Sequence, residues 1–208
     1  MNQDIKIGNK EGASAKGTHI ISVCAVETEE AFVLQNRLDA FSRARSLLLA
    51  SGTASREVLR AMWEEYNYFL EIFHKRYLRK QFYVENITVT VGRACFAQRL
   101  GGDTTYTGIV NYGALGTNNA APAVGNTQLG TETYRKALSS GTDLSTTTFL
   151  ENFYTASEVS GTFEEFGFFI DGGAGANTGQ LFNRFTHNVV KALTESLNVQ
   201  STIAWNDA

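Results

Sequence analysis

The feature that most constrains this chain is a series of short alternating segments in residues 83–208, separated by turns rich in Gly, Asn, Asp and Ser. Apolar and polar residues alternate in these segments with the period of two that is typical of β-strands with one buried face. The last segment is the most regular, with Leu197, Val199, Ile203 and Trp205 on one face. The strands expected from this pattern cover residues 88–91, 105–115, 131–137, 146–155, 161–170, 181–190 and 197–205.

The expected strands follow one another without long helical segments between them, which disfavours a parallel α/β sheet. Their number and spacing predict an antiparallel β-sandwich that is jelly-roll-like. A short helix is expected over residues 93–100, ended by two glycines. In the strand over residues 161–170, strict alternation predicts that Phe163 and Phe166 lie on opposite faces.

Residues 27–82 differ from the rest because their apolar residues recur every three or four positions, as in amphipathic helices. Two such stretches are separated by a break at Gly52, a natural helix C-cap, and Ser55 can cap the second stretch. We expect an antiparallel α-helical hairpin whose second helix runs from about Ser55 to Lys80. Its apolar face is too wide for one packing partner, so the β-domain or another subunit must cover the remainder.

The chain therefore divides into three parts. Residues 1–26 form an N-terminal arm and strand, residues 27–82 the helical hairpin, and residues 83–208 the antiparallel β-sandwich. The arm is polar and rich in glycine as far as Gly17, and a strand is expected over residues 17–26. The predicted fold class is α+β, mainly β, with the hairpin as an insertion.

Composition excludes several classes of protein. The net charge of −3 provides no field that would favour nucleic acid or an anionic membrane. No apolar run approaches the roughly 20 residues that span a bilayer, and residues 1–17 lack the apolar core of a secretory signal. We expect synthesis in the cytoplasm and no membrane partner. The surroundings of Cys24 and Cys95 are apolar, which favours buried free thiols over a disulfide.

The histidines and carboxylates form no pattern of a catalytic or metal site. His19, His74 and His187 are not spaced as ligands on one helix face, and a zinc site needs three or four convergent ligands. Glu164 and Glu165 are neighbours on an expected strand and point to opposite faces, so they cannot form an acid–base pair. Glu165 or Glu151 could still meet a residue from another strand, which leaves a β-rich glycosidase as the least favoured alternative.

The glycine-rich segment over residues 171–179 lacks the Gly-Lys-Ser/Thr ending of a phosphate-binding loop and the spacing of a calcium-binding loop. We expect it to be a long hairpin turn in which glycine supplies positive φ angles. No G-x-S-x-G motif is present. The sequence thus predicts a protein that is not an enzyme, with no catalytic, cofactor-binding or metal-binding residues, no cofactor and no small-molecule substrate.

Positive charge is concentrated at the end of the second expected helix, in His74-Lys75-Arg76 and Arg79-Lys80. A favourable interaction with the negative end of the helix dipole explains this cluster. The alternative is a basic spot that contacts nucleic acid or an acidic neighbour. Four fixed cations are too few to favour nucleic acid, so we do not expect a nucleic-acid partner.

The order of motifs in the β-domain resembles that of tailed-bacteriophage virion structural proteins, akin to the β-domains of tail-collar and tail-fibre proteins. The resemblance covers about residues 86–206 and excludes the arm and the hairpin. This sequence has Phe168 where the family pattern has Leu, and Gly113-Ala-Leu-Gly116 at its G-x-G position. The motifs that carry it are residues 86–93 (NITVTVGR), 106–117 (YTGIVNYGALGT), 127–136 (TQLGTETYRK) and 158–168 (EVSGTFEEFGF), followed by the last alternating strand.

The resemblance implies a non-enzymatic virion component that assembles with copies of itself and with other virion proteins, in a tail, collar or fibre-attachment role. A capsid decoration or head–tail connector protein is the first alternative. The second is a host-glycan-binding module that would use the loops over residues 116–126 and 171–179, with Asn118, Asn119 and Asn177 as the candidate contacts. The expected location is the virion, after synthesis in the host bacterium.

Overall fold

The structure is a computed structural model, and it describes residues 15–205 of the 208-residue chain. The described chain contains three helices, α1 (Glu29–Ser51), α2 (Arg56–Tyr77) and α3 (Thr90–Leu100). Its ten strands are β1 (Ala15–Ala25), β2 (Leu78–Glu85), β3 (Ile87–Thr88), β4 (Val110–Gly116), β5 (Glu132–Ala137), β6 (Ser140–Leu144), β7 (Thr147–Tyr154), β8 (Gly161–Ile170), β9 (Gln180–Lys191) and β10 (Glu195–Trp205).

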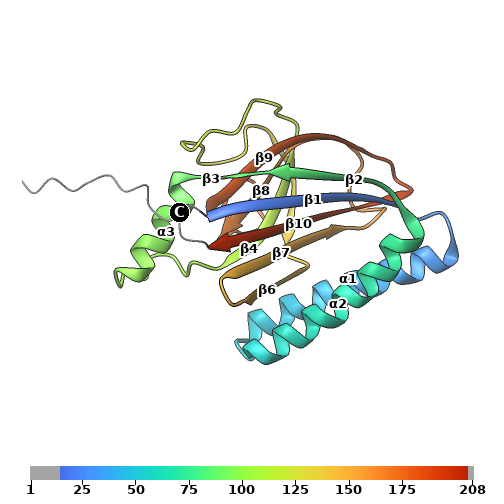
Figure 1. Ribbon diagram of the computed structural model, residues 1–208, viewed down its shortest axis with the longest axis horizontal. Coiled ribbons are helices and arrows are strands. Elements are labelled where there is room, and N and C mark those ends of the chain that lie inside the picture. The colour runs from blue at the N-terminus through green and yellow to red at the C-terminus, as the bar shows by residue number, and fades with distance from the viewer. Residues whose placement is uncertain (1–14, 206–208) are drawn as a thin grey trace, which may run out of the picture.

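The strands form two five-stranded antiparallel sheets that pack face to face (Figure 1). Sheet A has the order β2-β1-β10-β7-β6, and sheet B has the order β3-β9-β8-β4-β5. The long N-terminal strand β1 pairs with β10 along its whole length, from Ala15 opposite Trp205 to Ala25 opposite Glu195. The predicted mainly-β sandwich with an inserted helical hairpin is therefore confirmed.

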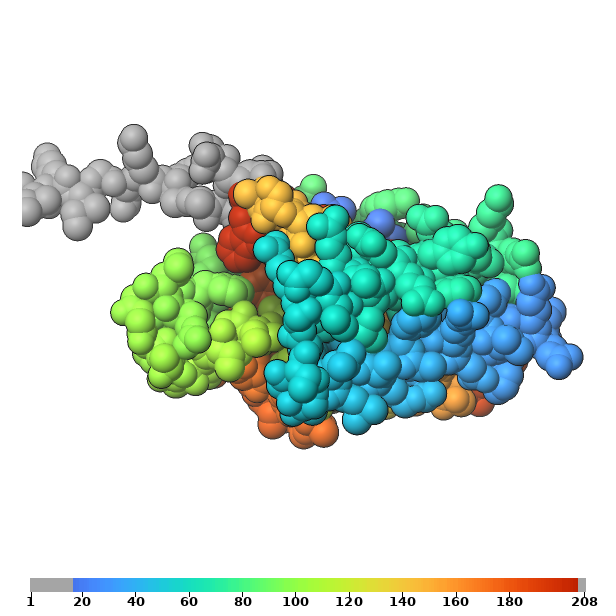
Figure 2. Space-filling model, turned by 90° about the horizontal axis from the view of Figure 1, so that it is seen from below, coloured from blue at the N-terminus to red at the C-terminus, as the bar shows by residue number. Residues whose placement is uncertain are grey.

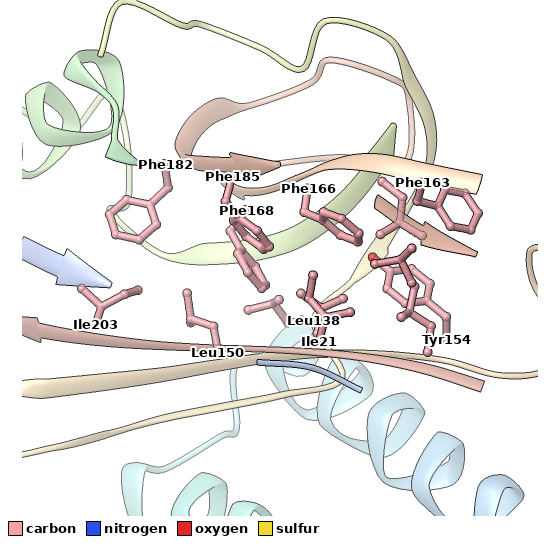
Figure 3. Close-up of a cluster of buried hydrophobic side chains, with 14 of the residues drawn as sticks. Ile21, Leu138, Leu150, Tyr154, Phe163, Phe166, Phe168, Phe182, Phe185 and Ile203 are labelled. Atoms are coloured by element: carbon pink, nitrogen blue, oxygen red, sulfur yellow. The ribbon is translucent and has the colours of Figure 1, made fainter. Parts of the chain in front are cut away.

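The core between the sheets is rich in phenylalanine. Sheet B contributes Phe166, Phe168 and Phe185, and sheet A faces them with aliphatic residues such as Ile21 and Leu150 (Figure 3). All five of these side chains are buried. Full burial of side chains this large stabilises the fold by about 1.5–3 kcal/mol each, so this layer is the main source of stability.

The helical hairpin packs on the outer face of its own sheet A, so the sandwich covers part of the hairpin's wide apolar face and leaves Tyr68 exposed (Figures 1 and 2). Tyr66, Leu70 and Phe73 of α2 meet Cys24 and Phe153 of the sheet in a second cluster of buried residues. The helix ends follow the sequence signals. Thr28 caps α1, Gly52 ends it with φ of 68°, and Ser55 caps α2.

The outer face of sheet B is covered by the loop between β4 and β5, residues 117–131. Leu129 of this loop packs with Ala114, Phe169 and Leu181 of the sheet and with Val89 in a third buried cluster. Both outer faces of the sandwich are thus covered, one by the hairpin and the other by this loop.

The second helix is shorter than expected because α2 ends at Tyr77 and residues 78–85 form β2. Phe82 and Val84 point from β2 into the core, whereas Tyr83 between them is exposed. This alternation is the signal of a strand, but the charged residues at the start of β2 resemble the end of a helix. Strand β1 occupies residues 15–25 rather than 17–26, and the arm that precedes it lies outside the described residues.

Two further strand predictions are wrong in detail. Of the first predicted β-domain strand, residues 88–91, only Thr88 lies in a strand, β3, and α3 begins at Thr90. Gly92 allows α3 to lie against β9, since a Cβ there would be 2.7 Å from the Phe182 backbone. The strand expected over residues 105–115 begins only at Val110, and β6 was not predicted.

The prediction for Phe163 is also wrong. A β-bulge between Phe163 and Glu165 shifts the register of β8 against β9. Phe163 therefore joins Phe166 in the core between the sheets instead of lying on the opposite face. The predictions for β5, β7, β8, β9 and β10 are confirmed to within two residues at each end.

Candidate functional site

One of the two fully buried ion pairs in the described chain joins Glu165 of β8 to Arg184 of β9. Arg184 Nη2 lies 2.9 Å from Glu165 Oε2, and the two side chains are 3% and 0% exposed, respectively. Both side chains also form hydrogen bonds to the backbone of the loop over residues 117–131. Glu165 accepts hydrogen bonds from the backbone amides of Asn118, Gly130 and Thr131, and Arg184 donates to the carbonyl oxygens of Asn118 and Ala120.

A second buried pair, Arg135 with Glu132 on β5, holds the β8–β9 turn. Arg135 Nη1 donates to the carbonyl oxygens of Gly173 at 3.1 Å and Thr178 at 2.9 Å. The Arg135 guanidinium also lies 4.4 Å from the centre of the Phe169 ring. Through these contacts the Arg135–Glu132 pair of β5 holds the β8–β9 turn in place.

The segment is a turn between two antiparallel strands, as predicted, but glycine supplies only one of its positive φ angles. Gly179 has φ of 79°, whereas the other two, 51° and 56°, belong to Asp171 and Asn177. The Asp171 carboxylate accepts a hydrogen bond from the Thr107 amide at 2.7 Å, which ties the turn to the segment before β4. The glycine-rich segment is therefore a structural turn that joins two antiparallel strands.

The loop asparagines that were candidates for glycan contact have different surroundings. Asn118 is half-buried, and its side-chain Oδ1 accepts a hydrogen bond from the Ala120 amide at 2.8 Å. Asn119 and Asn177 are exposed. The side chain of Asn118 is thus used to shape its own loop, which leaves two of the three as free surface groups.

The three histidines lie apart, as predicted. His19 is fully buried between the sheets and stacks on Phe185, with ring centroids 3.7 Å apart. Burial lowers the pKa of His19 to about 3, opposed in part by the Gln200 backbone, so the ring is neutral at physiological pH. His74 is in α2, and His187 packs against Phe82. In the described part of the chain, no three His, Cys, Asp or Glu residues are arranged to hold a metal ion.

The carboxylates considered for glycoside chemistry are on different surfaces. Glu165 lies on the outer face of sheet B, whereas Glu151 lies on the outer face of sheet A beneath the hairpin. Glu164 is half-buried and accepts a hydrogen bond from Asn188 at 3.2 Å. With the core between Glu151 and Glu165, these two carboxylates cannot act on one glycosidic bond.

Glu151 belongs to a polar cluster in the interface between sheet A and α2, and sequence reasoning did not identify this cluster. Glu151 is 3% exposed, and Tyr66, Asn198 and Gln200 lie close to its carboxyl group. Burial raises the pKa of Glu151 to about 8, and the three neighbours oppose part of that shift. Glu151 Oε1, Tyr66 Oη and both polar atoms of the Asn198 amide nevertheless lack a partner at hydrogen-bonding geometry. Such unpaired buried groups are rare in folded proteins and call for an explanation.

Two of the four basic residues after His74, the arginines, form ion pairs within the chain. Arg76 of the last turn of α2 pairs with Glu30, and Arg79 of β2 pairs with Glu27 at 3.0 Å. Both partners precede or begin α1, so these pairs join the start of the hairpin to its end. This arrangement supports the structural interpretation of the cluster over a nucleic-acid contact.

Large apolar side chains are exposed on the hairpin and at the sandwich edge. Phe32 and Leu47 on α1 and Tyr68 on α2 are 55%, 72% and 61% exposed. Tyr83 on the edge strand β2 is 69% exposed. Figure 2 shows the hairpin covering a large part of the face seen from below. Contiguous exposed apolar surface is a common feature of sites that bind other proteins, and these side chains are the large apolar groups that the hairpin offers to such a contact.

Together these features define a two-sheet antiparallel β-sandwich whose buried charges fix loops and whose outer helical hairpin presents apolar side chains. Comparison with protein-family models, curated proteins and solved structures finds no match to the chain. Among the described residues, no helix is both long and apolar enough to cross a membrane.

Proposed function

We propose that the chain is a non-enzymatic structural subunit of a tailed-bacteriophage virion, in a tail, collar or fibre-attachment role. In this role it binds copies of itself and other virion proteins through its arm, its helical hairpin and the edges of its sandwich. The motif order of residues 86–206 supports the virion assignment, and the resemblance to tail-collar and tail-fibre proteins favours the tail over a head decoration or connector role.

The observation that carries the assembly role is the exposed apolar surface of the hairpin. The inner face of the hairpin is already satisfied by sheet A, yet Phe32, Leu47 and Tyr68 remain in contact with solvent. Removing such side chains from water upon association is favourable by about 25 cal/mol per Å² of apolar surface. A neighbouring subunit is the partner that this surface suits.

The charges of the sandwich support the same role. Glu165, Arg184, Glu132 and Arg135 are buried and hold loops in place, so they are not free to act on a substrate. A body with fixed loops can present the same surface in every copy of a symmetric assembly. Strand β1 lies inside sheet A, so the arm before Ala15 is attached to this rigid body.

The test separates folding from assembly. Deletion of residues 1–14 leaves β1 whole, so the truncated protein should fold with an unchanged circular dichroism spectrum but no longer be incorporated into particles. Leu47→Lys on the hairpin should weaken incorporation in the same way, and Glu64→Lys, at an exposed charged position of α2, is the matched control. Normal incorporation of both the truncated protein and the Leu47→Lys variant would contradict the proposal.

A further inference from the structure

A cavity of about 300 Å³ lies between the two sheets, at the end of the sandwich where β10 ends. Its volume is at the lower end of the range for small-molecule sites in proteins. Most of its lining is apolar and comes from both sheets, from α3 and from the segment before β4. These apolar residues include Phe96, Ile109, Leu150, Phe182, Ile203 and Trp205.

Arg45 of α1 lines the same cavity, and among the described residues it is the only Lys, Arg or His in the lining. Its Nη1 donates a long hydrogen bond of 3.4 Å to the Leu138 carbonyl oxygen, and its Nε is buried without a partner. Nη2 forms no hydrogen bond or ion pair with any residue that the structure describes. Since every nitrogen of a guanidinium is a donor, most of the donor capacity of Arg45 is unused.

Nη2 is the nitrogen of Arg45 that a ligand can reach. Unlike Nε, it keeps access to solvent. Gly141 of β6 also lines the cavity, and a Cβ on this glycine would lie 3.3 Å from Nη2. Because glycine has no side chain, the space beside Nη2 stays open to the cavity.

The charge of Arg45 has no counter-charge in the described chain. Asp143 lines the same cavity but pairs with Arg56, and Asp171, in a neighbouring cavity, accepts a hydrogen bond from Thr107. Burial lowers the pKa of Arg45 to about 10, so the guanidinium is still charged at pH 7. A cation withdrawn from water is tolerated when it is paired, and an anionic ligand would supply the missing partner.

The lining selects the kind of anion. A carboxylate matches the planar donors of a guanidinium, and its single charge is balanced by one arginine. A phosphate carries more charge at pH 7 and would remain partly uncompensated. The Phe96 ring meets the rings of Phe182 and Trp205 edge-on, with centroids 5.7 Å and 5.4 Å apart. These rings offer an apolar wall to the remainder of the ligand.

We propose that the cavity between the sheets binds a small monocarboxylate with an apolar body, its carboxylate bonded to Arg45 Nη2 and its apolar body against Phe96, Phe182 and Trp205. The site is separate from the exposed hairpin surface on which the assembly role rests. The two proposals are therefore independent, and either stands if the other fails.

Tryptophan fluorescence tests the site on the full-length chain. The sequence contains two tryptophans, so Trp63→Phe leaves Trp205, in the cavity lining, as the only reporter. Octanoate and 4-phenylbutyrate are titrated separately at pH 7. Acetate, which has the charge without the apolar body, and 1-octanol, which has the body without the charge, are the comparators.

At least one of the two apolar carboxylates should change the emission saturably, with a dissociation constant on the order of 0.1 mM. Octanol should bind at least tenfold more weakly, and acetate should cause no saturable change in the same concentration range. The absence of a saturable change with both apolar carboxylates would overturn the proposal. Octanol or acetate binding as tightly as the apolar carboxylates would overturn it as well.

A first variant tests the cation. Arg45→Met keeps a long side chain, removes the charge and should weaken carboxylate binding at least tenfold while leaving octanol binding unchanged. Arg60→Met, at an exposed position of α2, is the matched control and should leave both affinities unchanged. Because Arg45 is largely buried without a counter-charge, Arg45→Met should unfold at the same or a higher urea concentration than the wild type.

A second pair of variants tests the apolar lining without touching the arginine. Ile109 at the cavity and Val124 in the loop over sheet B are 55% and 54% exposed, so neither supports the core. Ile109→Ser should weaken carboxylate binding about threefold, and Val124→Ser should have no effect. Carboxylate binding that is unaffected by both Arg45→Met and Ile109→Ser would place the ligand elsewhere and overturn the site.

Discussion

Glu165 and Arg184 form an ion pair across β8 and β9, and between them they make hydrogen bonds to both ends of the loop that covers sheet B. The pair is out of solvent, with Arg184 Nη2 2.9 Å from Glu165 Oε2. Charges removed from water are tolerated only when they are well paired. Here the pairing also supplies backbone partners for a loop that would otherwise leave its amides unsatisfied.

We therefore expect Glu165→Gln to be strongly destabilising. The change leaves the Arg184 guanidinium buried without its counter-charge, which typically costs about 3–5 kcal/mol. Urea-induced unfolding at pH 7 measures this loss, and amide hydrogen exchange should increase in residues 117–131. For a domain of this size, the melting temperature should fall by roughly 10 °C.

The control for this experiment is the exposed ion pair between Arg60 and Glu64 on α2. Its side chains are 57% and 58% exposed, so Glu64→Gln should change the unfolding free energy by less than about 0.5 kcal/mol. Equal effects of Glu165→Gln and Glu64→Gln would show that the buried pair contributes no more than a surface pair.

Because of Glu151, we expect the free energy of unfolding to fall as the pH rises. Its pKa is about 8 in the folded protein against 4.5 for an unperturbed group, so unfolding releases a proton between these values. The stabilising contribution is complete below about pH 4.5 and is lost as the pH approaches 8. Between pH 6.5 and 8 the loss should be about 2 kcal/mol. Glu151→Gln should remove this slope from unfolding curves measured across that interval, and an unchanged slope would contradict the assignment.

Because of His19, we expect the free energy of unfolding to fall as the pH is lowered in the acid range. Its pKa falls from 6.5 to about 3 through burial against Phe185, so unfolding takes up a proton in this range. Its contribution is complete above about pH 6.5 and is lost as the pH falls toward 3. His19→Phe keeps a flat ring in the aromatic core but cannot be protonated. Acid unfolding of this variant should begin at a lower pH than in the wild type; an identical midpoint would argue against His19 as the sensitive group.

The fold was predictable wherever one face of a strand is buried over its whole length. Strand β10 is such a case, because Leu197, Val199 and Ile203 all face the core, with only the buried Ser201 between them on that face. Strand β2 was missed because it lies at the sheet edge and starts with exposed charged residues. The bulge at Phe163 could not be inferred, since it depends on the register of β8 against β9 and leaves no local pattern.

The buried polar cluster around Glu151 was beyond sequence reasoning for a different reason. Tyr66, Glu151 and Asn198 come from α2, β7 and β10, and only the docking of the hairpin on sheet A brings them together. Their spacing along the chain therefore has no regularity. The single local clue is Glu151 itself, a carboxylate at a position in β7 where one face of the strand is covered by a helix.

The conformation of the β8–β9 turn requires glycine at position 179. Gly179 has φ of 79°, and a Cβ at this position would lie 2.4 Å from the Ile170 carbonyl oxygen. Gly179→Ala therefore introduces both backbone strain and a contact with backbone atoms that cannot move aside. We expect a loss of about 2–4 kcal/mol in the unfolding free energy.

Gly125 in the loop over sheet B provides the matched comparison, because no atom lies within 4 Å of its hypothetical Cβ and its φ is not positive. Gly125→Ala should be neutral or slightly stabilising, since alanine reduces the conformational entropy of the unfolded chain. Thermal unfolding of the two variants under identical conditions measures the difference. If Gly179→Ala were as stable as Gly125→Ala, the turn would have to adopt a different backbone conformation, and the anchoring of this turn by Arg135 would be wrong as well.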